Sequence, residues 1–197
     1  MRAMGPFTRS LAGLALVLAV PAAVAQEDAG KPAKAPPVFD PAADAPAEVA
    51  AALTRAREEN RRVLVVFGAD AGEASLRLDA FLREDPGVGR KLLYEYRVVK
   101  VAVGNFDRNM DLARRFEAAL KEQGLPSLTV LSGDGRVLAN RGTGDLREGA
   151  SFHAGRVLEF LGRWQAEPWD ARALLKGALE EAGRTDRKVL VHLGAPW

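Results

Sequence analysis

The chain of 197 residues contains no cysteine, which excludes disulfide bonds, cysteine–metal sites and thiol catalysis within it. Its formal net charge is +2 and no run of lysine or arginine stands out, so nucleic acid is not an expected partner. The two histidines have no clustered carboxylates around them in the sequence, so we expect neither a metal site nor a cofactor. The length suits one domain of ordinary size with extensions.

Residues 1–25 are typical of a secretory signal peptide. Arg2 and Arg9 are followed by an apolar run over residues 11–20 and by the small residues 23–25, which suit a cleavage site. The run is shorter than the roughly 20 residues that span a bilayer. We therefore expect a periplasmic or secreted protein without stable membrane insertion once the signal is removed. An uncleaved membrane anchor is the alternative.

Residues 26–46 have the composition of a linker, since eleven of these 21 residues are Pro or Ala and charges are interspersed among them. Such a segment buries little apolar surface and is expected to be extended. The folded part is predicted to begin near Ala47, with a helix whose apolar residues recur at helical spacing from Val49 to Ala56.

Apolar patterns and turn residues predict an α/β fold for residues 47–165. The order is helix, strand, helix, strand, helix, strand, strand, helix, which implies a central mixed sheet flanked by helices. After the first helix, the predicted elements are strand 63–67, helix 75–83, a break at 85–87, strand 98–103, a helix capped by Asp107 or Asn109, strand 127–131, a turn at 132–135, strand 136–139 and a closing helix through 157–164.

This part of the chain resembles the thioredoxin-like family. In that family an apolar strand leads through a Trp into Cys-x-x-Cys at the start of a helix. Here Ala71 stands at the Trp position, and Gly72 and Ser75 stand at the two cysteine positions. The sequence Gly-Leu-Pro at 124–126 is a second mark of the resemblance, and Val-Gly-x-Phe-Asp at 103–107 is similar to a secreted branch of the family. The resemblance implies a thioredoxin-like fold.

The chemistry of the family is missing at its usual positions. Val66 stands where many members carry a buried acid, so three functional positions are replaced together. Ser75 lacks a neighbouring base and is interpreted as a helix cap, not as a nucleophile. Asp70 and Glu73 are interpreted as complements to the positive helix N-terminus. No catalytic residue is predicted, and we expect the chain to be redox-inactive by itself.

Pro126 matches a proline that is cis in the family and shapes a groove for an extended substrate. The resemblance therefore implies a peptide groove for a client protein. An equally weighted alternative is that Pro126 serves only the architecture of the turn. The groove is predicted from Ala71, Glu73, Ala74, Leu125 and Pro126.

The end of the chain repeats its centre. Residues 177–197 match residues 51–71 without a gap at an offset of 126 residues, with nine of 21 positions identical. We expect residues 171–197 to begin a second, truncated thioredoxin-like repeat, with Trp197 opposite Ala71. This favours a binding or structural module of a tandem thioredoxin protein. Two alternatives stay open: the N-terminal part of a thiol-disulfide oxidoreductase whose Cys-x-x-Cys lies beyond Trp197, and a chance match at a genuine terminus.

Overall fold

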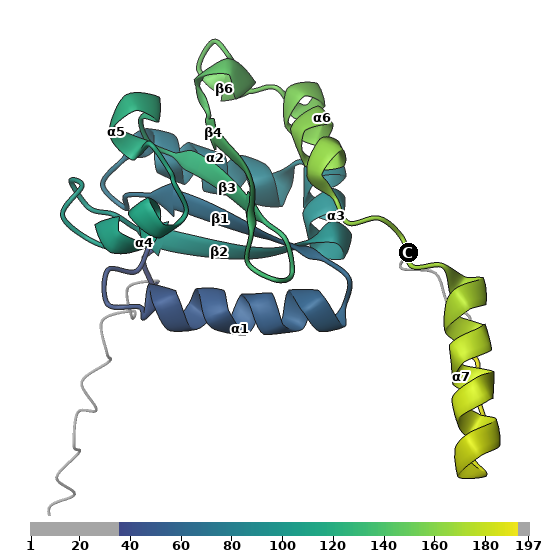
Figure 1. The fold of residues 1–197 in the computed structure, drawn as a ribbon. Coiled ribbons are helices and arrows are strands. Elements are labelled where there is room, and N and C mark those ends of the chain that lie inside the picture. Colours follow the sequence, from purple (N-terminus) through teal and green to yellow (C-terminus); the bar gives the residue numbers. More distant parts are fainter. Residues whose placement is uncertain (1–35, 193–197) are drawn as a thin grey trace, which may run out of the picture. The chain divides into compact units, whose positions relative to one another are not determined.

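The computed structural model describes residues 36–192, and the predicted signal peptide and Trp197 lie outside the described residues. A four-stranded sheet with the order β2-β1-β3-β4 forms its centre (Figure 1). The strand β1 (Arg62–Gly68) pairs in parallel with β2 (Tyr96–Ala102) and antiparallel with β3 (Ser127–Leu131), which in turn pairs antiparallel with β4 (Val137–Gly142). The prediction of an α/β fold with a central mixed sheet flanked by helices is confirmed.

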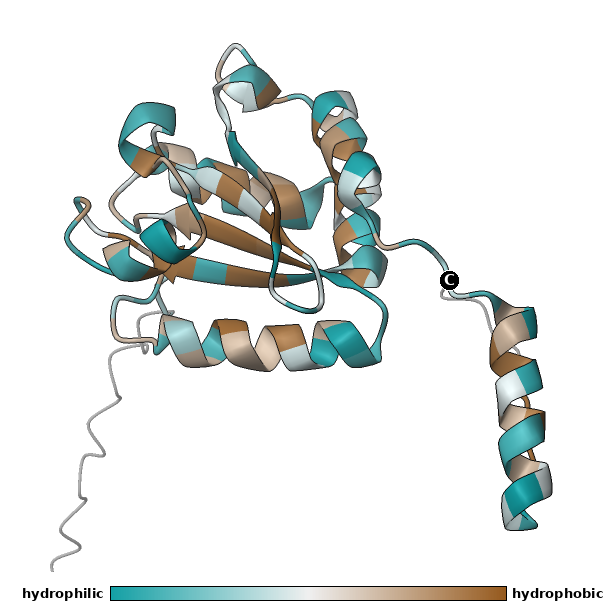
Figure 2. Cartoon of the chain, in the orientation of Figure 1, coloured by the Kyte–Doolittle hydropathy of each residue, from teal (hydrophilic) through white to brown (hydrophobic). Residues whose placement is uncertain are grey.

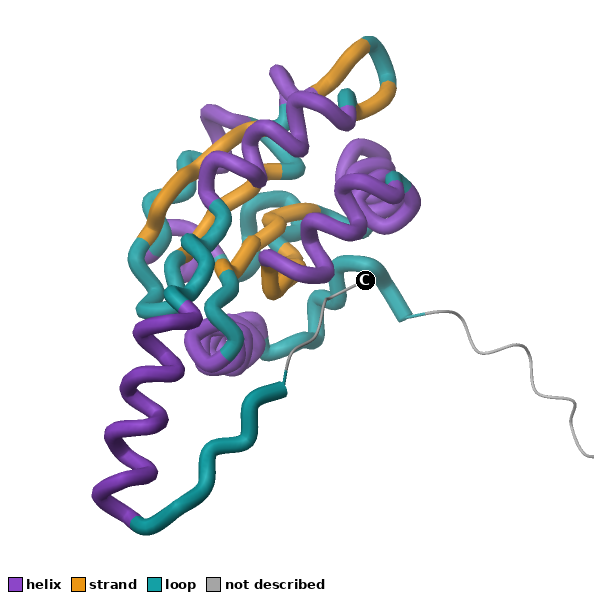
Figure 3. The backbone as a smooth tube through the Cα atoms, turned by 90° about the vertical axis from the view of Figure 1, so that its right-hand side faces the viewer, coloured by secondary structure: helices purple, strands orange, loops and turns teal. Residues whose placement is uncertain are grey.

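Figure 3 shows the strands in orange with helices in purple around them. A short pair of strands, β5 (Arg147–Glu148) and β6 (Ser151–Phe152), follows the 3-10 helix η1 (Gly144–Leu146). The α-helices of the described residues are α1 (Ala45–Glu58), α2 (Glu73–Glu84), α3 (Pro86–Glu95), α4 (Met110–Arg115), α5 (Leu120–Gln123), α6 (Ala154–Trp164) and α7 (Ala171–Thr185).

The central strand β1 divides its side chains between two apolar cores, because successive side chains of a strand point to opposite faces. Leu64 and Val66 lie in a core with apolar residues of α2, α3 and α6. Val63, Val65 and Phe67 lie in a second core with residues of α1 and α4. The hydrophobic colouring of β1 is correspondingly continuous (Figure 2). Burial on both faces explains why the run from Val63 to Phe67 is apolar throughout.

The predicted break after α2 is instead the start of another helix, α3. Asp85 caps it, since its Oδ1 accepts hydrogen bonds from the backbone N–H groups of Gly87 at 3.0 Å and Val88 at 2.8 Å. Pro86 occupies the first turn, where its missing N–H costs no helical hydrogen bond. The sequence Asp-Pro-Gly therefore separates two helices and does not lead directly into the strand.

The predicted helix after Asn109 is divided into α4 and α5. Glu117, between them, has a φ of 55°, in the left-handed region that interrupts a right-handed helix. Asn109 is the N-cap residue of α4, but its side chain makes no capping bond to the helix. Its Nδ2 donates to the backbone oxygen of Ala102 at 2.8 Å, which ties the loop back to the end of β2.

The folded part begins earlier than the predicted start near Ala47. Phe39 is 1% exposed and belongs to the core beside β1. Asp70 Oδ1 accepts hydrogen bonds from Val38 N at 2.9 Å and Phe39 N at 3.4 Å. Asp70 therefore anchors this incoming segment, a role that differs from the predicted one at the N-terminus of α2.

The segment after α7 carries no regular structure at positions 188–192, where the repeat of the sequence places the equivalent of β1. Leu190 there is 93% exposed. Leu193 and the residues after it lie outside the described part. In residues 36–192 no helix is both long and apolar enough to cross a membrane.

Candidate functional site

The turn between β1 and α2 places Gly72 and Ser75 beside each other. Gly72 N donates to Ala69 O at 3.0 Å, and Ser75 N donates to Gly72 O at 2.9 Å. Ser75 is 1% exposed, and its Oγ accepts a hydrogen bond from Ala69 N at 3.2 Å. The cap residue of α2 is Gly72, so the interpretation of Ser75 as the cap is wrong. Ser75 instead satisfies a backbone N–H of the turn from within the first turn of the helix.

The spacing between positions 72 and 75 suits a covalent link. A Cβ atom built on Gly72 would lie 3.3 Å from Ser75 Oγ and 3.2 Å from Ala69 O. In a disulfide the Cβ atom of one residue lies about 3 Å from the sulfur of the other, so the two side-chain positions are close enough for such a bond. Gly72 has φ −92°, which residues with side chains adopt readily. The backbone geometry for a residue pair is therefore present without the sulfur atoms.

A surface pocket of about 350 Å³ opens beside this turn. Three segments converge on it: the turn after β1, the loop after β2, and the residue before Pro126. Its walls are apolar or backbone groups, with Asn105 as the one amide side chain. The lining residues are Ala69, Ala71, Gly72, Ala74, Ser75, Gly104, Asn105, Phe106 and Leu125.

The structure brings together three of the five predicted groove residues: Ala71, Ala74 and Leu125. Pro126 is buried beside the pocket without lining it, and its backbone oxygen accepts a hydrogen bond from Thr143 Oγ1 at 2.9 Å. The Leu125–Pro126 peptide bond is cis. Glu73 also does not line the pocket, and its exposed carboxylate lies 3.5 Å from the guanidinium of Arg77.

The loop after β2 supplies pocket residues that were not among the predicted site. Gly104 has a φ of 54° and Phe106 one of 64°, so the chain turns sharply twice within three residues. Asp107 Oδ1 accepts from Asn105 N at 3.0 Å and fixes this turn. The signal that could have identified Asn105 and Phe106 is the sequence Val-Gly-x-Phe-Asp, which follows a buried strand directly.

A buried carboxylate, also missed from the sequence, lies on α2. Asp79 is 4% exposed, and its carboxylate contacts Lys100 Nζ at 2.5 Å and Arg83 Nε at 3.0 Å. Lys100 is the register partner of Val66 in β2. One partner of the ion pair is therefore the strand neighbour of Val66, the position at which many members of the thioredoxin-like family carry an acid. The sequence signal that could have identified Asp79 as buried is its helical spacing. It shares one face of α2 with three other residues, and all four are buried: Ser75, Leu78, Asp79 and Leu82.

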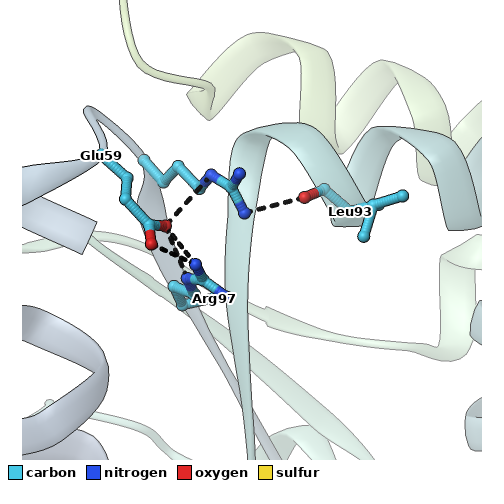
Figure 4. A network of polar contacts seen from close by, with 4 residues as sticks. Glu59, Leu93 and Arg97 are labelled. Carbon is cyan, nitrogen blue, oxygen red and sulfur yellow. Dashed lines mark hydrogen bonds and ion pairs between the residues drawn. The ribbon is translucent and has the colours of Figure 1, made fainter. Parts of the chain in front are cut away.

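A larger hollow of about 900 Å³ follows β2, the edge strand of the sheet, and shares no lining residue with the pocket at Gly72. Arg97 and Arg61, which line it, form the network in Figure 4. Arg97 Nε donates to Glu59 Oε2 at 2.7 Å, and Arg61 Nη1 donates to Leu93 O at 2.8 Å. The hydrogen bond from Arg97 is the main cause that lowers the pKa of Glu59 below its ordinary value.

The described residues contain no group of three or more metal-ligating side chains. His153 Nδ1 accepts from Arg156 N at 3.3 Å and caps α6, which accounts for its position. Residues 36–192 therefore present a small, largely apolar pocket beside the turn that holds Gly72 and Ser75.

Comparison with solved structures identifies the fold. A structure described as a disulphide isomerase from Xylella fastidiosa Temecula1 matches with a TM-score of 0.58 and 27% identity, over 66% of this chain and 98% of that chain. A thioredoxin from Thermus thermophilus matches with a TM-score of 0.43 and 23% identity, over 68% of this chain and 90% of that one. A structure described as DsbH oxidoreductase matches with a TM-score of 0.45 and 15% identity, over 57% and 78%.

The chain therefore has a thioredoxin fold, and its neighbours are thioredoxin-like and disulfide isomerase-like proteins. The Xylella structure supports this fold, because it combines the highest of these TM-scores with coverage of nearly its whole length. No family model matches the chain. No curated protein matches it either.

Proposed function

We propose that this protein is a periplasmic or secreted thioredoxin-like module that binds an extended peptide of a client protein and is redox-inactive by itself. The observation that carries the proposal is the pocket in which Gly72 and Ser75 lie beside Ala71, Ala74 and Leu125. Apart from Ser75 and the amide of Asn105, its walls are apolar and backbone groups, the surfaces that an extended peptide contacts through its side chains and its own backbone. The thiols are absent from the sequence while the pocket is present.

Binding is tested with a fluorescently labelled, carboxymethylated insulin B chain as an extended probe. Ala74→Arg places a long charged side chain at the pocket and is expected to weaken binding at least about tenfold, a loss of about 1.4 kcal/mol. Leu76→Arg is the matched control, because Leu76 is exposed on the same helix and does not line the pocket. Equal binding by the wild type and both variants, or no binding at all, contradicts the proposal.

Redox inactivity is tested separately by the turbidity of insulin as its disulfides are reduced. A thiol-disulfide exchanger needs an attacking thiolate and a resolving thiol. With no cysteine in its sequence, the chain is expected to add nothing to the rate with dithiothreitol alone. Catalysis above that background would refute this part of the proposal.

The second candidate function is that of a thiol-disulfide oxidoreductase of which this chain is the N-terminal part. The resemblance of the Xylella disulphide isomerase favours it, as does the repeat of residues 51–71 at 177–197. The Cys-x-x-Cys pair of that enzyme would lie beyond Trp197. A full-length gene product without a cysteine pair after that residue rejects this candidate.

Secretion is tested by the mature N-terminus. The predicted signal peptide implies cleavage after Ala25, so mass spectrometry of the protein recovered from the periplasm or medium is expected to find a chain that begins at Gln26. Recovery of an intact N-terminus in the membrane fraction supports the alternative, an uncleaved anchor.

A further inference from the structure

Helix α7 carries an apolar face that residues 36–192 leave exposed. Leu174, Leu175 and Leu179 are 52%, 42% and 56% exposed, and none of the residues of α7 is buried. Isolated helices of this length are marginal in water, because most helical stability comes from packing of an apolar face. The sequence of α7 is therefore that of a helix that requires a partner surface.

The geometry of α7 repeats that of α1 at the same offset of 126 residues that relates the sequences. Both helices begin after an aspartate N-cap, Asp44 for α1 and Asp170 for α7, whose side chain accepts from backbone N–H groups of the first turn. Each helix is followed by a residue in the left-handed conformation, Asn60 with a φ of 54° and Asp186 with a φ of 51°.

A further backbone hydrogen bond closes the end of both helices in the same way. Arg61 N donates to Ala56 O at 2.8 Å after α1, and Arg187 N donates to Ala182 O at 3.1 Å after α7. The donors and the acceptors are again 126 residues apart. The left-handed residue is Asn in one copy and Asp in the other, so this position is not one of the identical ones. The shared geometry there is therefore evidence of similarity beyond the identical residues. A chance match of letters does not explain a complete helix with equivalent ends.

The surface that packs against α1 indicates which kind of surface the apolar face of α7 would pack against. In α1, Val49 is 3% exposed and Ala56 is fully buried, and both lie in one core with Val63, Val65 and Phe67 of β1. The residues of α7 at the equivalent positions are Leu175 and Ala182. They are likewise apolar and lie on one face, with two turns of helix between them.

The segment after α7 supplies the equivalent of β1. Val189 and Val191 stand where β1 has Val63 and Val65, the side chains that pack on α1. The third equivalent, Leu193, lies outside the described residues. Val191 is 56% exposed and Leu190 is 93% exposed, although the matching residues of β1 are completely buried. The apolar run Val189–Val191 is typical of a strand in the interior of a sheet that is covered on both faces.

We propose that the apolar face of α7 is the docking surface for a second thioredoxin-like sheet, of which the segment from Lys188 onward is the central strand. The occupant is thus a β-sheet face of the same protein, arranged on α7 as β1 and β2 are arranged on α1. The inference rests on the repeat of residues 51–71 at 177–197, which also supports the second candidate function, and does not depend on peptide binding at Gly72.

The test compares Leu175→Asp with its structural counterpart Val49→Asp in the full-length gene product. Thermal unfolding is expected to show two transitions, one for each sheet. Leu175→Asp is expected to lower one of them by more than about 5 °C or to abolish it, and Val49→Asp is expected to affect the other. Leu175→Ala, a milder change, is expected to shift the same transition as Leu175→Asp.

The protein of residues 1–197 provides the internal control. Here Leu175→Asp is expected to leave unfolding unchanged, whereas Val49→Asp is expected to destabilise the fold. A gene product that ends at Trp197, or a full-length protein whose unfolding is unaffected by Leu175→Asp, overturns the proposal. The insulin B chain assay measures only binding at the pocket of the first sheet. Failure of that assay would leave the unfolding result for α7 unaffected, and failure of the unfolding test would leave the binding result unaffected.

Discussion

The ring of Phe39 lies directly over Gly68, at the end of the central strand. A Cβ atom at position 68 would come within 2.5 Å of Cε1 and Cζ of that ring, closer than packed carbon atoms approach each other. The absence of a side chain at Gly68 is therefore what allows the segment before α1 to cover the core. This contact anchors the segment before α1 to the central strand.

Gly68→Ala is expected to destabilise the protein by about 1–3 kcal/mol, because the added methyl group displaces a buried aromatic ring. The measurement is denaturant unfolding, with Gly144→Ala as the control, since nothing lies within 4 Å of a Cβ there. In a Phe39→Ala background the cost of Gly68→Ala should largely disappear. Additive effects of the two changes would show that the added methyl group at position 68 does not clash with the ring of Phe39.

The double variant Gly72→Cys/Ser75→Cys is expected to form a disulfide in air. The 3.3 Å between a Cβ at position 72 and Ser75 Oγ supports this, although the Cβ must shift slightly from Ala69 O. Reduction of the bond should lower the free energy of unfolding by about 2 kcal/mol, at the low end for disulfides because the loop that it closes is short. Thiol titration with and without reductant measures the bond, and the two single variants serve as controls. Two free thiols after oxidation would contradict the geometry described for the turn.

Asp79→Asn is expected to cost about 1–3 kcal/mol of stability. The change leaves Lys100 without its closest counter-charge, and the penalty is below that of a fully buried pair because the Lys100 side chain is 35% exposed. Glu73→Gln is the control on the same helix, since its carboxylate is 81% exposed and its ion pair contributes little. Chemical denaturation compares the two variants. A loss as small for Asp79→Asn as for Glu73→Gln would contradict the structural role of the pair.

Glu59 is expected to make stability depend on acid pH. The hydrogen bond from Arg97, with the attraction of Arg97 and Arg61, holds the pKa of this carboxyl below its ordinary value of 4.5. A carboxyl whose pKa is lowered by folding stabilises the protein above the unfolded-state value, and this contribution disappears as the pH falls through the folded-state value. Glu59→Gln should therefore destabilise modestly at pH 7, by less than about 1 kcal/mol.

The difference between wild type and Glu59→Gln should shrink as the pH is lowered from 4.5 through the lower pKa of the folded state. Denaturant unfolding at a series of pH values measures it. Glu58→Gln is the neighbouring control, because the described structure shows no ion pair at that exposed carboxylate. A difference that stays constant down to complete protonation would mean that the charge of Glu59 does not contribute.

The repeating patterns of the sequence determined the layers of the fold. The apolar run from Val63 to Phe67 identified the central strand, and Ser127–Leu131 was predicted with the bounds that the structure shows. The central strand is recognisable because burial on both faces leaves no polar position in its run. The strand Ser127–Leu131 is buried as well but contains the hydroxyls of Ser127 and Thr129. The helix α3 escaped prediction, since Asp85, Pro86 and Gly87 suit a turn and a helix start equally well.

At the site, the sequence by itself determined which chemistry is absent, because a chain without cysteine has no thiol in any conformation. It also placed Ala71, Ala74 and Leu125 in a common groove, through the family resemblance. Only the tertiary structure decided that Asn105 and Phe106 complete the pocket, that Pro126 lies behind it, and that Asp79 meets Lys100. These relationships join residues far apart in the chain, and packing of the layers, which no local pattern encodes, sets the distances between them.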